Sequence, residues 1–241
     1  MTSGVVNNPW LQIGAPSVSE TAPVSTDPSV IATLTAAEVA ATQALVLGAG
    51  TEWANLPAPA DFTGLLFVND VGINGSLWRS NGTIWTLVGG ACILGQSAVA
   101  VSCTATTDEE VLQSFAIPAG VMGVNGALRL TALWTITNSG NNKTVRARLG
   151  ETALGGSVWI AQVATTVATL NSIPQVLRNR NAANSQVTYA AANGGATTLT
   201  GTAATTLTVD TSAATVFAIT GQKASAGETL TLEGYTLELL R

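Results

Sequence analysis

Alternation of apolar and polar residues is the feature that most constrains the fold of this chain. In the segment at 127–138, "ALRLTALWTITN", large apolar residues occupy every second position: Leu128, Leu130, Ala132, Trp134 and Ile136. The segment at 143–150, "KTVRARLG", repeats the scheme with arginines between its apolar residues. Successive side chains of a β-strand point to opposite faces, so this period of two predicts strands with one buried face.

Comparable short segments, bounded by Gly, Asn and Pro, run through the rest of the chain. We predict further strands at 65–68, 76–80, 83–87, 99–103, 110–117, 158–169, 186–191, 207–209, 214–220 and 228–240. In the last of these, the inward series Leu230 and Leu232 resumes one position late at Tyr235, which predicts a β-bulge at Gly234. Many short strands with turn residues between them indicate an all-β fold, an antiparallel sandwich or barrel, over 91–241.

The connector at 51–90 contains Asn81-Gly82 between two short strands, which is the strongest local signal for a hairpin. Both residues tolerate the positive φ of a type I′ turn, and a two-residue loop places Trp78 directly opposite Trp85. We therefore expect a small β-meander whose two indoles form a cross-strand pair. The alternative is that Trp78 and Trp85 are exposed and stack on a host surface glycan.

Residues 1–50 are predicted to be an anchoring region. Prolines recur in its first part and favour an extended arm: Pro9, Pro16, Pro23 and Pro28. The arm also carries apolar residues that a solvated tail would not need, and these are the expected anchors on a particle: Trp10, Leu11, Ile13, Val30 and Ile31. A capping box at Thr35 and Glu38, with Gly48 as a stop, predicts one short helix at 35–47. A disordered tail is the alternative for the arm.

The chain is poor in charge, with 10% charged residues, 46% hydrophobic residues and a mean hydropathy of +0.37. This composition is typical of subunits that bury much of their surface against copies or partners. No apolar run approaches the roughly 18 residues that span a bilayer, so membrane insertion is not expected. With nine Lys and Arg residues and a net charge of −5, the chain offers no basic stripe for nucleic acid.

The first residues show neither the basic nor the apolar region of a secretory signal, so no such signal is expected. Cys92 and Cys103 are the two cysteines, and they belong to no recognisable cysteine framework. Reduced, buried thiols are therefore favoured over a disulfide.

Most residue types of catalytic sites are missing or scattered. The absence of histidine removes the usual general base and the commonest metal ligand. Lys143 and Lys223 lie in no motif for a serine–lysine pair, and the loop at 138–142 has no carboxylate for a metal ion. The acidic run at 108–110 could supply glycosidase carboxylates, but a solvated turn before a strand is the simpler interpretation. We predict that the protein is not an enzyme and that it uses no cofactor and no metal.

The passage "FVNDVGINGSLWRSNGTIWTLV" resembles a short meander of tailed-bacteriophage virion proteins, in which a strand, a D-x-G turn and a W-x-S-x-G-T-x-W hairpin precede a distal domain. The matching positions here are Phe67, Asp70, Gly72, Gly75, Trp78, Asn81, Gly82, Thr83 and Trp85. The segments at 116–150 and 227–240 are similar to the jelly-roll-like distal domains of such proteins. Together the resemblance covers about two-thirds of the chain, and its meander is the more specific part.

The resemblance implies a fold and a function. The fold is an all-β, antiparallel jelly-roll-like sandwich at 91–241, preceded by the meander at 51–90 and by the arm and helix at 1–50. The function is that of a virion surface protein, assembled in the host cytoplasm as a homotrimer and attached to the capsid through its N-terminal region as a head fibre or decoration protein. A tail fibre or a module that recognises host glycan is the alternative, and the lack of a long fibrous repeat favours the capsid.

Overall fold

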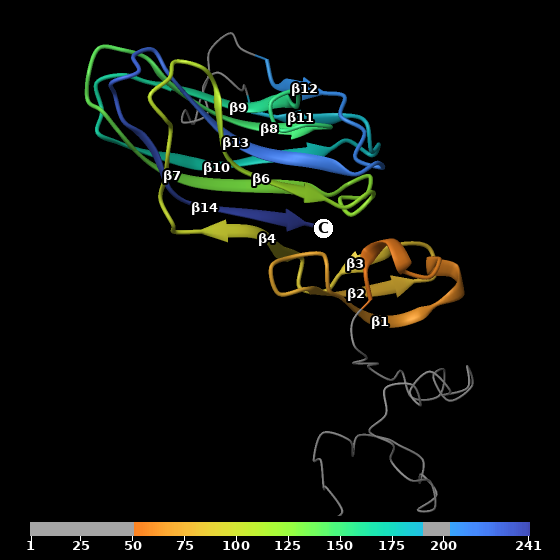
Figure 1. Ribbon diagram of the computed structural model, residues 1–241. Helices are drawn as coiled ribbons and strands as arrows, with labels where there is room; N and C mark the ends of the chain where they lie inside the picture. Colours follow the sequence, from red (N-terminus) through yellow and green to blue (C-terminus); the bar gives the residue numbers. More distant parts are fainter. Residues whose placement is uncertain (1–50, 190–202) are drawn as a thin grey trace, which may run out of the picture.

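The computed structural model describes residues 51–189 and 203–241, which form a small sheet followed by a larger two-layer sandwich (Figure 1). Regular structure within these ranges is β-sheet apart from two short 3₁₀ helices. The predicted arm, its apolar anchors and the predicted helix lie outside the described residues. Within them, no helix has the length and apolar character needed to cross a membrane.

The connector is a three-stranded antiparallel sheet in the order β1-β2-β3. Its elements are η2 (Trp53–Asn55), η3 (Pro59–Asp61), β1 (Thr63–Val68), β2 (Ser76–Asn81) and β3 (Trp85–Leu87). Buried positions alternate with exposed or half-buried ones along β2 and β3, as the sequence pattern requires. A sheet of this size is marginal by itself, so its stability depends on what its buried face packs against.

The turn between β2 and β3 uses the predicted residues in an unexpected way. Asn81 and Gly82 have positive φ angles of 56° and 86°, as expected of this dipeptide. However, the Asn81 side-chain oxygen accepts hydrogen bonds from the backbone N–H groups of Thr83 and Ile84, each at 2.9 Å. The Asn81 backbone N–H donates to the Ile84 carbonyl oxygen, so the ladder closes two residues later than predicted on β3.

The register of the hairpin follows from this turn. Trp78 lies opposite Leu87, and Trp85 lies opposite Ser80. The prediction that the two indoles share one face is confirmed, because a shift of two residues preserves the side of the sheet. The prediction that Trp78 and Trp85 oppose each other directly is wrong.

The sandwich contains the remaining strands. They are β4 (Ala91–Ser97), β5 (Val101–Ser102), β6 (Glu110–Ile117), β7 (Ala127–Ile136), β8 (Lys143–Gly150), β9 (Ser157–Ala164), β10 (Thr169–Asn179), β11 (Gln186–Thr188), β12 (Thr205–Leu207), β13 (Thr215–Lys223) and β14 (Leu230–Leu240). One sheet has seven strands in the order β12-β11-β10-β7-β14-β4, with β5 also paired to β14. The second sheet has four strands in the order β6-β13-β8-β9. Every strand pairing is antiparallel.

The connectivity is that of a jelly roll. Along the chain, β4 belongs to the seven-stranded sheet, β6 to the four-stranded sheet, β7 to the first again, and β8 and β9 to the second. The chain then returns to the first sheet with β10, crosses with β13 and ends in the first sheet with β14. The orders β4-β14-β7-β10 and β6-β13-β8-β9 are two interlocked Greek keys, with the β11–β12 hairpin added at one edge. The jelly-roll expectation is confirmed.

The core lies between the inner faces of the two sheets. Its largest fully buried apolar side chains come from both layers: Leu128, Trp134, Leu149, Trp159, Leu177, Phe217 and Leu230. The predicted inward positions of β7 and β8 are buried, and the pairing of β14 with β7 shifts between Leu232 and Gly234. The bulge predicted at Gly234 is therefore confirmed.

Two strands of the sandwich escaped the sequence pattern. In β4, the sequence "ACILGQS" does not alternate, and its pairing with β14 shifts between Leu237 and Glu238. In β10, a shift in the pairing with β7 between Ser172 and Gln175 accompanies a proline in the strand. The single strand predicted at 158–169 instead covers β9 from its second residue to its end and the first residue of β10, with residues 165–168 between the two strands.

Candidate interaction surfaces

The two tryptophans of the connector are buried, so they do not form a glycan platform. Trp78 is 0% exposed and Trp85 is 6% exposed. The ring of Trp78 lies 4.5 Å from that of Trp53, and the ring of Trp85 stacks on Phe62 with centroids 5.5 Å apart. The indole N–H of Trp85 donates to the Pro57 carbonyl oxygen at 3.0 Å. Because neither indole face is free for a sugar, the alternative assignment of Trp78 and Trp85 as glycan contacts is wrong.

The joint between the connector and the jelly roll is built around Arg241. Its guanidinium carbon lies 5.7 Å from the ring centroid of Trp53 and 5.1 Å from that of Trp78, within the range of cation–π attraction. Its Nη1 donates to the Val121 carbonyl oxygen at 2.9 Å, and the Trp53 indole N–H donates to the Ala119 carbonyl oxygen at 2.7 Å. Burial lowers the pKa of Arg241. These contacts clamp the aromatic face of the connector onto the loop between β6 and β7.

A second set of contacts joins the two parts through the backbone. The Ile73 N–H donates to the Ile93 carbonyl oxygen at 2.9 Å, and the Arg241 N–H donates to the Gly90 carbonyl oxygen at 3.2 Å. Gly72 lies so close that a Cβ there would be 3.1 Å from the same Ile93 oxygen. The connector is therefore held on the jelly roll both by these backbone hydrogen bonds and by the aromatic contacts of Arg241.

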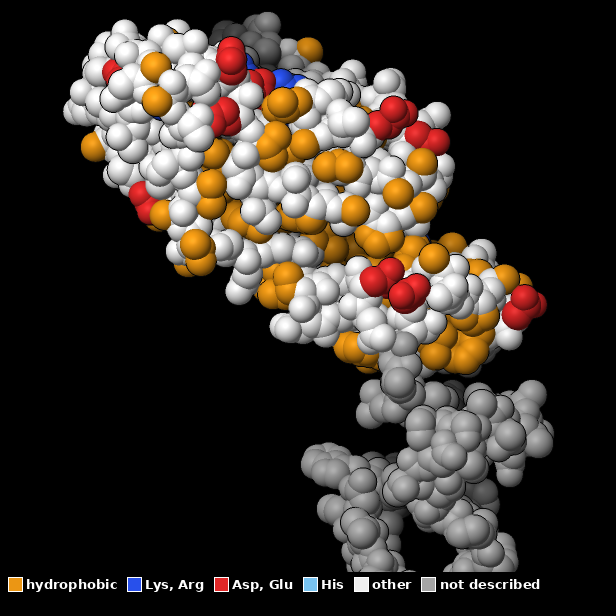
Figure 2. All heavy atoms as spheres, in the orientation of Figure 1, with side chains coloured by type: hydrophobic (Ala, Val, Ile, Leu, Met, Phe, Trp, Pro, Cys, Tyr) orange, Lys and Arg blue, Asp and Glu red, His pale blue; other side chains and the backbone are white. Residues whose placement is uncertain are grey.

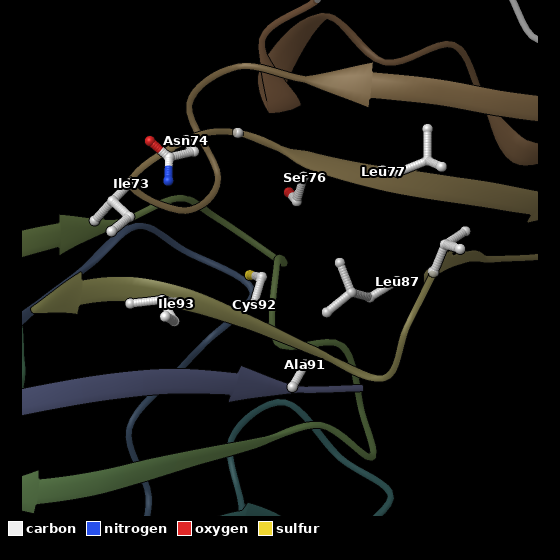
Figure 3. A pocket seen from close by; sticks show the side chains of 10 residues that line it. Ile73, Asn74, Ser76, Leu77, Leu87, Ala91, Cys92 and Ile93 are labelled. Carbon is white, nitrogen blue, oxygen red and sulfur yellow. The ribbon is translucent and has the colours of Figure 1, made fainter.

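A pocket of about 260 Å³ opens beside this joint, between β4 and the segment that leads into β2 (Figure 3). Ser76, Leu87 and Cys92 face the same space, and Ile73 lies at its border. Burial raises the pKa of the Cys92 thiol to about 11, although a hydrogen bond with Ser76 acts in the opposite direction. A thiol with this pKa stays protonated and is a poor nucleophile at neutral pH.

Both cysteines are free thiols and half-buried. As predicted, no disulfide joins them, and their burial is only partial. Burial, together with the negative charge of Glu110, also raises the pKa of Cys103 to about 11. In the described ranges, no three His, Cys, Asp or Glu side chains gather at a spacing that could hold a metal ion.

A polar cluster at one end of the jelly roll brings Lys143 close to a serine. The Lys143 ammonium is 2.8 Å from Ser139 Oγ and also donates to the Asn141 carbonyl oxygen at 2.7 Å. It lies 3.6 Å from a carboxylate oxygen of Glu228, and the Ser139 hydroxyl donates to the same carboxylate. These contacts tie the loop at 138–142 to β8 and to the segment before β14.

Lys223 is the cross-strand neighbour of Lys143 and is equally enclosed, with 3% and 1% of their surfaces exposed. Its ammonium donates to the carbonyl oxygens of Thr104, Ala226 and Glu228, at 2.6, 3.2 and 2.9 Å. Three carbonyl acceptors match the three protons of the ammonium group. Lys223 thus ties the segment after β5 to the loop between β13 and β14.

The outer face of the four-stranded sheet is covered by a charged network. Glu109 accepts hydrogen bonds from Nε and Nη2 of Arg148, both at 2.7 Å, and from the Thr220 hydroxyl, and Arg146 lies at 3.1 Å. Burial raises the pKa of Glu109, but these hydrogen bonds and charges outweigh it, so that the net pKa is lowered. The prediction that residues 108–110 are a solvated turn is wrong for Glu109, because the carboxylate lies across β13 and β8.

The outer face of the seven-stranded sheet has a different character. We define the threonine face as the outward side chains of β4, β5, β14, β7 and β10: Ile93, Gln96, Ser102, Arg129, Thr131, Leu133, Thr135, Thr169, Val176, Thr231, Thr236, Glu238 and Leu240. They form cross-strand rows, such as Ser102, Thr231, Thr135 and Thr169. The solvated face of an antiparallel sheet is usually polar; this face combines hydroxyl side chains with aliphatic ones and carries one close ion pair, between Arg129 and Glu238.

The described surface as a whole is also sparsely charged. Figure 2 shows hydrophobic side chains gathered along the border of the jelly roll that faces the connector, with a few acidic groups scattered around them. Apolar side chains that are at least one-third exposed include Val99, Val101, Leu133 and Val163. The low content of charged residues in the sequence therefore corresponds to exposed apolar and threonine-containing surfaces in the fold.

Comparisons with known proteins add similarities of fold. No protein-family profile and no curated protein matches the sequence. Among solved structures, the CBM2 module of the evolved Dit of Lactobacillus casei BL23 phage J-1 is 12% identical, with 52% of this chain and 67% of that chain covered and a TM-score of 0.28. The VP2 subviral particle of infectious bursal disease virus is 10% identical, with 68% and 48% covered and a TM-score of 0.26. This chain thus spans about half of the capsid protein, and TM-scores this low establish no shared function.

Proposed function

We propose that the protein is a non-enzymatic structural component of a tailed-phage particle, a head fibre or capsid decoration protein that self-associates as a trimer. In this proposal residues 1–50 attach the protein to the capsid, the connector joins them to the jelly roll, and the jelly roll projects from the surface. The likeness of the connector sequence to phage virion meanders supports this proposal. Fold alone does not decide function, because jelly rolls also occur in lectins and in cupins.

The observation that carries the proposal is the charge-poor threonine face. A protein that works as a free globule needs charged side chains to keep such a sheet in water. A protein that works inside an assembly does not, because the face is covered when copies and partners meet. Self-association also multiplies weak anchoring, since linked copies bind together with higher joint affinity than any single arm.

The rigid joint supports the same arrangement. Arg241, Trp53 and Trp78 hold the connector against the loop at 118–126, so the direction of the jelly roll is set where the connector ends. A projecting domain on a flexible linker would need no such clamp. In a surface protein the clamp gives each copy the same orientation on the particle.

The test is binding of the full chain to purified particles that lack it. Replacing the arm residues Trp10 and Ile13 by Ala removes two apolar anchors, and we expect at least a tenfold loss of binding, since each buried large side chain contributes about 2 kcal/mol. The matched control is Gln12→Ala, which changes a polar neighbour in the same segment. Equal binding of the two variants would contradict the proposal, and binding to isolated tails but not to heads would assign the protein to the tail.

A further inference from the structure

Within residues 51–189 and 203–241, nothing covers the threonine face as the segment before β6 covers the other sheet. On the four-stranded sheet, Glu109 lies across two arginines, and the Gln222 side chain donates to the Thr107 carbonyl oxygen at 3.2 Å. The segment before β6 is therefore folded over that outer face. For the threonine face, the contacts among the described residues are the cross-strand ones within the sheet, such as the 2.7 Å hydrogen bond between Ser102 and Thr231.

The face carries few charges, and its central pair cancels. Arg129 and Glu238 form two hydrogen bonds, at 2.6 and 2.8 Å, and so neutralise each other within the face. By the same register Arg178 of β10 lies on this side of the sheet at one end of the face, and Glu233 lies in the β14 bulge near the other end. The whole chain has a net charge of −5. Two acidic copies repel at most of their surface, and a neutral face is where they can approach without an added cation.

The size of the face matches what a stable interface needs. The central strand β7 has 10 residues, which corresponds to a length of about 33 Å. Four neighbouring strands, β4, β14, β7 and β10, span about 19 Å at the usual strand spacing. The flat area is therefore about 600 Å², and side-chain relief raises it toward the roughly 800 Å² that each partner buries in a standard interface.

The chemistry of the face also suits a second sheet. Five of its thirteen side chains are Thr, and four more are aliphatic (Ile93, Leu133, Val176 and Leu240), so most of them are short or branched. Such surfaces pack against another sheet about 10 Å away, with methyl groups in contact and hydroxyls free to bond across the boundary. A carbohydrate ligand would instead call for exposed aromatic rings, and the tryptophans of the jelly roll core, Trp134 and Trp159, are buried.

We propose that the threonine face is the surface on which a second copy of this chain is seated in the oligomer. This inference rests on the self-association in the proposed function and adds the surface that carries it. The face then accounts for the charge-poor composition without requiring a partner of different chemistry.

The test is the molar mass of the full chain in solution, measured by light scattering during gel filtration. Leu133→Arg places a charge on the threonine face at a position that is already 43% exposed, so the monomer should still fold. The matched control is Val163→Arg, at a position 58% exposed on the outer face of the four-stranded sheet. We expect wild type and Val163→Arg to be oligomeric and Leu133→Arg to be monomeric, or to need at least a tenfold higher concentration to assemble.

A second variant guards against misfolding. Thr131→Arg lies on the same strand and face, and circular dichroism and tryptophan fluorescence verify that each variant keeps the native fold. A folded Leu133→Arg and Thr131→Arg that remain oligomeric would overturn the inference, as would a monomeric wild type. Oligomers that survive both variants but no longer bind particles would also overturn it, because the face would then contact a particle protein.

The same variants separate this inference from the proposed function. A monomeric Leu133→Arg that still binds particles weakly through residues 1–50 supports both statements. An oligomeric wild type that binds no particle refutes the proposed function, while the loss of assembly in Leu133→Arg would still support the threonine face as the interface.

Discussion

Arg241 is the single side chain whose loss should most disturb the joint between the connector and the jelly roll. Truncation in Arg241→Ala removes the hydrogen bond to the Val121 carbonyl oxygen and the attraction to the rings of Trp53 and Trp78. A hydrogen bond from a charged donor contributes about 1.5–3 kcal/mol, and a partly desolvated cation–π contact contributes about 1 kcal/mol. Recovering hydration of the guanidinium offsets part of this sum. We expect a loss of about 2–4 kcal/mol in the free energy of unfolding.

The measurement is urea unfolding followed by tryptophan fluorescence, since two of the indoles lie under the guanidinium. With a urea dependence of about 2–3 kcal/mol per M, the expected loss moves the midpoint down by about 1 M. Arg241→Met is the informative control, because it keeps an unbranched apolar stem and removes the charge and the hydrogen bond. An Arg241→Ala midpoint within error of wild type, with an unchanged fluorescence spectrum, would refute the clamp.

The remaining predictions concern the charged network and the thiols. In Glu109→Gln the ion pairs with Arg146 and Arg148 are lost, and we expect a destabilisation of about 2–3 kcal/mol at pH 7, measured by urea unfolding. Because the folded pKa of Glu109 is lowered from its ordinary 4.5, its contribution is complete above that value and is lost as pH falls through the folded pKa. Wild type and Glu109→Gln should therefore converge in stability as the pH falls through the folded pKa of Glu109, and a gap that stays constant down to pH 2 would contradict the assignment. For Cys92 and Cys103, with pKa values of about 11, we expect reaction with a thiol reagent at pH 8 to be at least tenfold slower than for a free cysteine, and equal rates in native and unfolded protein would show that they are not shielded.

Sequence reasoning alone located much of the fold. The inward series of β7 and β8 and the bulge at Gly234 depend on a period of two along a single strand, which is a local property of the chain. Strand β6 was also predicted at its observed bounds. β4 and β10 were missed because bulges interrupt their alternation, and neither has the clear apolar series on both sides of the bulge that revealed the one in β14.

The candidate surfaces depended far more on tertiary structure. The sequence singled out Trp78 and Trp85, but their burial results from Trp53 and Phe62, which arrive from a segment outside the hairpin. The acidic run at 108–110 reads as a solvated turn until β8 and β13 place arginines and a threonine around Glu109. No local sequence pattern predicts these contacts, because the residues that form them are far apart in the chain.

The amino-acid sequence by itself determined the class of the fold and the side of each alternating strand that turns inward. It also fixed the small number of charged residues available for the protein surface. Which strands become neighbours, and hence where that shortage concentrates, was decided only in the tertiary structure. The threonine face exists because β4, β7, β10 and β14 lie side by side, although they are separated along the chain. Pairing between distant strands is a cooperative choice of the whole molecule, so no single segment encodes the surface that they form together.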